Sequence, residues 1–145
     1  MSAPLTLDLH EIDEYSKQML DYVDSEFPEV GKRFMKKEAN RLKSKVKKTA
    51  AGSIISDTGN YVNGFRAGKK VYEYGDCKFN VRVYNGAPHA HLIEYGHLMK
   101  THSGKVKGFI PGFHILENSS ISFQSEFAGH IENDLCEMIK EALEK

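Results

Sequence analysis

The feature that most constrains the fold of this chain is the division of its charge into long blocks. Residues 8–29 carry eight acidic residues against one lysine, and residues 32–48 carry nine basic residues against one glutamate. From residue 117 onward, seven acidic residues face two lysines, so a formal net charge of zero hides strong segregation. Blocks of opposite sign favour helices that pair by charge, either within a subunit or between subunits.

Apolar residues recur at about 3.6-residue spacing in the same blocks, which predicts three long helices. The first covers about 8–24, with Asp8 as its candidate N-cap, and ends because Phe27-Pro28 disfavours helical ψ before the proline. The second covers about 28–49, with apolar residues on one face and lysines on the other. The third spans about 113–143, and Gly129 marks a bend in it.

Between the second and third helices the pattern becomes that of antiparallel strands. A turn-rich region from 51 to 64 precedes strands at about 65–74 and 77–84, which are joined across a Gly75-Asp76 turn. In the second strand, apolar and polar residues alternate with the period of a half-buried strand.

Short elements fill the remainder of the middle region. Asn85-Gly86 predicts a turn, and residues 88–95 predict a two-turn helix. Residues 97–108 predict a loop, with a flanking strand at 106–110. Long loops without internal structure are uncommon unless they bind something.

Together these elements predict an α+β fold, in which a small antiparallel β-sheet is packed by long N-terminal and C-terminal helices. A length of 145 residues suits a single domain over 1–145. Its parts are a helical region 1–50, a strand and turn region with a short helix at 51–112, and a C-terminal helix at 113–145. The absence of a long apolar run predicts no membrane span, and the start of the chain does not resemble a signal peptide.

A cluster of histidines at 89–97 raises the possibility of a metal site. His91 and His97 are six residues apart with Glu94 midway, whereas a helical zinc-protease motif places two histidines four residues apart. His89 shares a face with His91 only in an extended chain. The spacing therefore favours a short capped helix with no metal and no cofactor. A metal-dependent hydrolase that uses His89, His91 and Glu94 stays open as an alternative.

Four short motifs follow one another between residues 58 and 116: Thr58-Gly59-Asn60-Tyr61, then Asn85-Gly86-Ala87-Pro88, then His91-Leu92-Ile93-Glu94-Tyr95-Gly96-His97, then Pro111-Gly112-Phe113-His114-Ile115. Their order resembles that of the tail-completion or minor tail-component family of tailed bacteriophages. In the last motif two residues are inserted between Pro111 and His114, which loosens the expected register of the final helix.

The resemblance implies a non-enzymatic virion structural protein that acts at the head–tail interface, as a tail-completion or neck component. It implies a homo-oligomeric, hexameric ring that joins the head–tail connector to the tail-terminator and tail-tube proteins. Such a protein is built in the host cytoplasm and ends in the virion, close to the DNA in the channel and without membrane contact.

The family motif residues His91, Glu94, Tyr95, Gly96 and His97 also have structural interpretations. We expect Glu94 to accept hydrogen bonds from backbone amides or to pair with a cation of the following loop. We expect Tyr95 to bury its ring. Gly96 is expected to end the helix as a left-handed residue, where any side chain costs energy.

The cationic loop that follows the motif is the candidate assembly contact. It carries Lys100, His102, Lys105 and Lys107. A second candidate surface is the basic helix at 32–48, which could contact DNA phosphates. That block lacks interleaved aromatics apart from Phe34, which favours a solvated or subunit-facing helix over a DNA-binding module.

Overall fold

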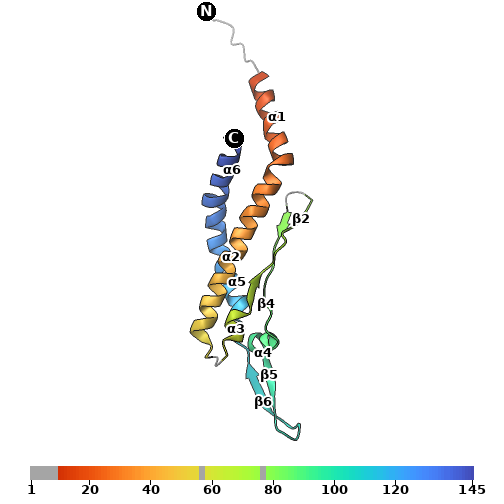
Figure 1. Cartoon of the computed structure of the whole chain (residues 1–145), viewed down its shortest axis with the longest axis vertical. Helices are drawn as coiled ribbons and strands as arrows, with labels where there is room; N and C mark the ends of the chain where they lie inside the picture. The colour runs from red at the N-terminus through yellow and green to blue at the C-terminus, as the bar shows by residue number, and fades with distance from the viewer. Residues whose placement is uncertain (1–9, 56–57, 76–77) are drawn as a thin grey trace, which may run out of the picture.

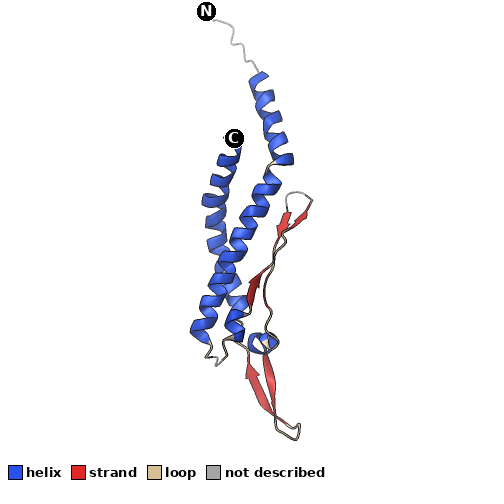
Figure 2. Ribbon diagram, viewed as in Figure 1, coloured by secondary structure: helices blue, strands red, loops and turns tan. Residues whose placement is uncertain are grey.

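Long helices and short antiparallel strand pairs make up the chain in the computed structural model, which describes residues 10–55, 58–75 and 78–145 (Figure 1, Figure 2). In chain order the elements are α1 (His10–Ser25), α2 (Phe27–Ser53), α3 (Asn60–Asn63), β1 (Phe65–Ala67), β2 (Tyr72–Tyr74), β3 (Lys78–Asn80), β4 (Val83–Asn85), α4 (Ala90–Tyr95), β5 (Gly96–Lys100), β6 (Val106–Pro111), α5 (Ile115–His130), the π-helical segment η1 (Ile131–Leu135) and α6 (Cys136–Leu143). This is the α+β fold expected from the periodicity.

The first two helices run end to end (Figure 1). The predicted break at Phe27-Pro28 is confined to Glu26, whose amide still donates to the Tyr22 carbonyl at 2.9 Å, while the Val30 amide donates to the Glu26 carbonyl at 3.1 Å. Pro28 lies in the first turn of α2, where a missing amide removes no hydrogen bond of that helix. The path of α1 therefore continues into α2. The α2 helix ends at Ser53, beyond the predicted end at 49. The candidate N-cap Asp8 lies outside the described residues.

The C-terminal helix runs antiparallel to α2 (Figure 1). It is interrupted by the π-helical segment η1. It begins at Ile115 rather than at residue 113, because Phe113 and His114 instead return their amides to α4. The π segment η1 begins two residues after Gly129, where a bend is predicted, and Asn133 Nδ2 donates to the Gly129 carbonyl at 3.0 Å. A π turn holds more residues than an α turn, which rotates the faces of the helix on either side of it. No helix in the described part of the chain is long and apolar enough to cross a membrane.

Residues 65–75 and 78–85 pair as the two arms of one long hairpin, whose strands are shorter than predicted. β1 pairs with β4 and β2 pairs with β3, both antiparallel. The expected strands at 65–74 and 77–84 are each interrupted in the middle, although the Gly68 amide still donates to the Arg82 carbonyl at 2.7 Å. Part of the expected turn, residues 76 and 77, lies outside the described residues. The preceding region also holds a short helix, α3, that the sequence did not predict.

The largest correction concerns residues 97–108, which form a second hairpin rather than a loop; only the flanking strand expected at 106–110 is confirmed, as β6. β5 begins at Gly96 and pairs antiparallel with β6, with a register shift between Met99 and Lys100. The turn itself is short, since the Thr101 amide donates to the Lys105 carbonyl at 2.8 Å and Thr101 Oγ1 accepts from the Lys105 amide at 3.1 Å. This hairpin extends away from the helices at one end of the molecule (Figure 1).

A small core lies where the second half of α2 meets α3, β1, α4 and the start of α5. Its buried residues are Val46, Ala50, Tyr61, Phe65, Ala90 and Ile115. The Tyr61 and Phe65 rings meet edge to face with centroids 5.1 Å apart, an arrangement that aromatic pairs prefer. The core therefore holds the family motif of α4 between elements that are far apart in the sequence.

Candidate functional site

The carboxylate of Glu94 is the structural centre of the family motif. Glu94 is only 7% exposed. Its Oε1 atom accepts two hydrogen bonds. The Tyr61 hydroxyl of α3 donates at 2.7 Å, and the Leu116 amide of α5 donates at 2.9 Å. One side chain thus joins three elements, and the expectation that Glu94 accepts from a backbone amide is confirmed.

The second of these bonds makes Glu94 the cap of a helix to which it does not belong. The N-terminus of α5 has no side-chain cap of its own, and its N-cap residue His114 has a left-handed φ of 48°. The first amides of a helix have no partner within it and carry partial positive charge, so a carboxylate beside them is stabilising. The His114 amide also donates to the Glu94 carbonyl at 3.1 Å.

Tyr61 is held as a neutral hydrogen-bond donor. Burial raises the pKa of its phenol far above the usual value of 10, and the hydrogen bond to Glu94 raises it further. Because the phenol keeps its proton at any physiological pH, the Glu94 oxygen that it contacts is continuously occupied. The geometry is that of a structural link, since a general base needs a carboxylate that can reach a substrate proton.

Gly96 and Gly112 meet where β5 leaves α4 and β6 returns to it. Gly96 has φ 83° and ψ 175°, so the expected positive φ is confirmed, but the residue is extended rather than left-handed helical. A Cβ on Gly96 would collide with the Ile110 carbonyl oxygen, and one on Gly112 would collide with the Glu94 carbonyl. The inserted residues Gly112 and Phe113 thus form the point where the chain leaving β6 crosses the end of α4. The Phe113 amide holds this crossing together by donating to the Ile93 carbonyl at 2.8 Å.

The other motif residues do not converge on a shared centre. His89 and His91 are exposed, whereas Glu94 points into the core, and no group of three potential metal ligands occurs among the described residues. The expectation that Tyr95 buries its ring is wrong, because Tyr95 is 68% exposed; its ring meets the His114 ring edge to face, with centroids 6.0 Å apart. It is exposed because the neighbouring Glu94 takes the inward-facing position of this short helix.

Glu38 on α2 carries a second buried carboxylate, which sequence reasoning did not single out. It is 2% exposed; its Oε1 accepts from Arg41 Nη1 at 2.7 Å, and its Oε2 lies 2.6 Å from His130 Nδ1 of α5. Arg41 also reaches Asp134 of η1 at 2.7 Å. The one signal in the sequence is that Glu38 is the only acid within the basic block.

These contacts show that the charge blocks pair within the subunit. Lys37 and Arg41 of α2 both bind Asp134, and Lys45 of α2 binds Glu126 of α5. The Arg41 and Lys37 hydrogen bonds hold the pKa of the Asp134 carboxyl below its usual value of 3.8. Part of the basic helix is therefore neutralised by the acidic C-terminal helix, which leaves fewer cations for any other partner.

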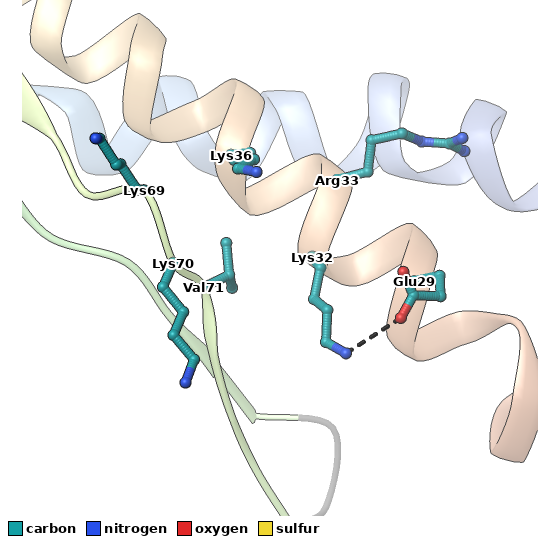
Figure 3. A pocket seen from close by; sticks show the side chains of 7 residues that line it. All are labelled: Glu29, Lys32, Arg33, Lys36, Lys69, Lys70 and Val71. Carbon is teal, nitrogen blue, oxygen red and sulfur yellow. Dashed lines mark hydrogen bonds and ion pairs between the residues drawn. The ribbon is translucent and has the colours of Figure 1, made fainter.

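A cationic groove lies between α2 and the segment that joins β1 to β2 (Figure 3). It encloses about 460 Å³ and is lined by Glu29, Lys32, Arg33, Lys36, Lys69, Lys70 and Val71. Lys32 is paired with Glu29 at 3.2 Å and with Glu73 at 3.1 Å. Within the described residues Lys36 and Lys69 form no ion pair, so the groove keeps a positive charge that could hold an anion.

The β5–β6 hairpin carries the remaining candidate residues. Lys100, His102, Lys105 and Lys107 are all exposed on it, two in strands and two in the turn. The hairpin also exposes large apolar side chains that the sequence analysis did not single out: Leu98, Met99, Val106, Phe109 and Ile110. Sequence reasoning missed them because residues 97–108 were assigned to a loop, and the flanking strand expected at 106–110 was given no partner strand.

Comparison with known families identifies the chain. A family model described as "Bacteriophage HK97-gp10, putative tail-component" matches residues 13–96, more than half of the chain. That range begins within α1 and ends at Gly96, so it includes Glu94 and its partner Tyr61. Comparisons with curated proteins and with solved structures find no match. The chain belongs to the HK97-gp10-like family, and it is a structural component of a bacteriophage tail.

Proposed function

We propose that this tail component completes the tail at the head–tail interface, where copies of the chain form a hexameric ring. The ring joins the connector on the head side to the tail-terminator and tail-tube proteins, around the channel through which DNA passes. Its contribution is assembly and not catalysis. The exposed β5–β6 hairpin is the observation that carries this proposal.

A two-stranded hairpin is marginal in water on its own, and three or more strands or a packed face are needed for stability. Here the hairpin stands away from the core and leaves Phe109 59% exposed. Exposed apolar side chains gathered on one element mark an interaction surface in a soluble protein. The lysines around them favour an acidic partner surface and fix its orientation.

Replacing Lys100, Lys105 and Lys107 with serine tests the proposal. These side chains are exposed and far from the core, so the triple variant should melt within about 0.5 kcal/mol of the wild type. In a phage that lacks its own copy, the variant should leave filled heads and tails as separate particles under the electron microscope. Normal yields of joined particles would contradict the role of the hairpin, and a collapsed monomer would assign these lysines to the fold.

The cationic groove supports a second candidate function, contact with DNA in the channel. Lys69 and Lys70 lie more than thirty residues after Lys36 in the sequence and add their charge to the basic helix, which the basic block alone did not predict. Phosphate contacts make binding strongly dependent on salt. Retention on duplex DNA that falls with salt, and that Lys36→Ser with Lys69→Ser weakens, would support this candidate. Equal retention of the variant would argue against it.

A further inference from the structure

The N-terminal helix presents an apolar face that lacks a partner in the described structure. Ile12, Tyr15, Leu20 and Val23 are exposed, with Leu20 as much as 65% accessible. The α1 helix projects past the other elements, and it packs mainly on α2, which continues it (Figure 1). An isolated helix of this length is marginal in water, and most helical stability in proteins comes from packing an apolar face.

Acidic residues border this apolar face. At about 100° per residue, positions eleven apart fall on nearly the same line of a helix. Ile12 and Val23 therefore share one line, Asp13 and Asp24 share another, and Leu20 lies between the two. The whole helix carries five acids against Lys17 and His10. The exposed surface of α1 is thus both apolar and negative.

The β5–β6 hairpin offers a surface of the opposite sign. Leu98 and Phe109 are cross-strand partners, as are Lys100 and Val106 beyond the register shift. Since alternate residues of a strand face the same way, these four side chains share one face of the hairpin. The hairpin holds three lysines and no acid between residues 96 and 111.

We propose that the β5–β6 hairpin of one subunit docks on α1 of a second copy of this chain. The proposal rests on the ring proposed above and names the contact that builds it. The two surfaces lie at opposite ends of an elongated molecule (Figure 1), so the contact is head to tail. Head-to-tail contacts between identical subunits generate closed rings when the rotation closes.

The chemistry of the two surfaces selects this pairing over its rivals. Two α1 helices, or two hairpins, would bring like charges together, which opposes association. The cationic groove of α2 matches the charge of α1 but offers only Val71 to its apolar residues. DNA would match the lysines of the hairpin but would leave Leu98 and Phe109 without an apolar partner.

Charge reversal on each surface tests the contact with the full-length chain. One variant carries Lys100→Glu and Lys105→Glu on the hairpin, and another carries Asp13→Lys and Asp24→Lys on α1. A third variant combines all four changes. The matched control reverses Lys47 and Lys48, which are exposed on α2 and form no ion pair within the described residues. Assembly is followed over a concentration series by native mass spectrometry and sedimentation, and circular dichroism confirms that each variant folds.

Each surface variant should need a concentration at least about ten-fold higher than the wild type for half-assembly, because a lost charge pair weakens association by that order. The combined variant should return to within about three-fold of the wild type, and an equimolar mixture of the two surface variants should also assemble, since the reversed faces match across alternating subunits. The control should assemble like the wild type.

Unchanged assembly of either surface variant, or a combined variant as defective as its parents, would overturn the contact while leaving the ring intact. Loss of DNA retention in the hairpin variant with normal assembly would overturn the contact and assign the hairpin to DNA instead. If the wild-type protein stays monomeric throughout the concentration series, both the proposed contact and the proposed assembly of the chain into a ring by itself are overturned.

Discussion

Replacing Glu94 with alanine should destabilise the fold far more than its single small helix suggests. The substitution removes the acceptor of both the Tyr61 hydroxyl and the Leu116 amide, and Tyr61 is itself only 4% exposed. A buried donor left without a partner costs about 1–3 kcal/mol, and the loss of a helix cap costs about 1 kcal/mol. The free energy of unfolding should therefore fall by about 3 kcal/mol.

Conservative variants separate the two hydrogen bonds. Glu94→Gln keeps an acceptor oxygen but loses the charge, so it should cost about 1 kcal/mol, because charge-assisted bonds are about twice as strong as neutral ones. Tyr61→Phe removes only the hydroxyl, and its effect should be mostly absent when Glu94 is already alanine. That non-additivity, of at least about 1 kcal/mol, is the signature of direct coupling.

Urea denaturation followed by circular dichroism measures these differences, with Glu141→Ala as the matched control on an exposed glutamate. The control should stay within about 0.5 kcal/mol of the wild type. If Glu94→Ala costs no more than the control, the carboxylate does not cap α5 in solution. If the Tyr61 and Glu94 effects simply add, the bond between them contributes nothing.

Three further predictions concern other parts of the structure. Gly96→Val should lower the free energy of unfolding by more than about 1 kcal/mol in the same urea assay, because its φ of 83° and the Ile110 carbonyl leave no room for a side chain; a neutral effect would contradict this. The hydrogen bonds from Arg41 and Lys37 lower the pKa of Asp134, so its stabilising contribution is present above the unfolded value of 3.8 and is lost as pH falls through the lower folded value. Asp134→Asn should therefore flatten the acid side of a melting-temperature profile below about pH 4, and an unchanged profile would refute the pairing. Tyr95→Ser should leave the melting temperature nearly unchanged, since the ring is exposed, and a change worth more than about 1 kcal/mol would show that the ring is packed.

Local patterns determined the helices and the family before any tertiary contact was known. The 3.6-residue spacing places α1, α2 and the C-terminal helix within a few residues of their observed positions. This is possible because the apolar period of an amphipathic helix can be recognised within one continuous segment of the sequence. The motif from His91 to His97 is likewise local, and the family match ends inside it. Opposite charge blocks also predicted that helices would pair, although they left open whether the pairing is internal.

Tertiary structure alone decided what the key side chains do. Glu94 contacts Tyr61, which lies 33 residues away in the sequence, and Glu38 contacts His130, which lies 92 residues away. No spacing rule connects residues so far apart in the sequence. Residues 97–108 read as a loop because their glycine, serine and lysine content is typical of loops, yet β5 and β6 pair once the crossing at Gly96 and Gly112 brings their ends together. Strand pairing depends on a neighbour supplied by the fold, whereas helical hydrogen bonds form within the segment itself. The three long helices were therefore predictable, whereas the pairing of β5 with β6 was not.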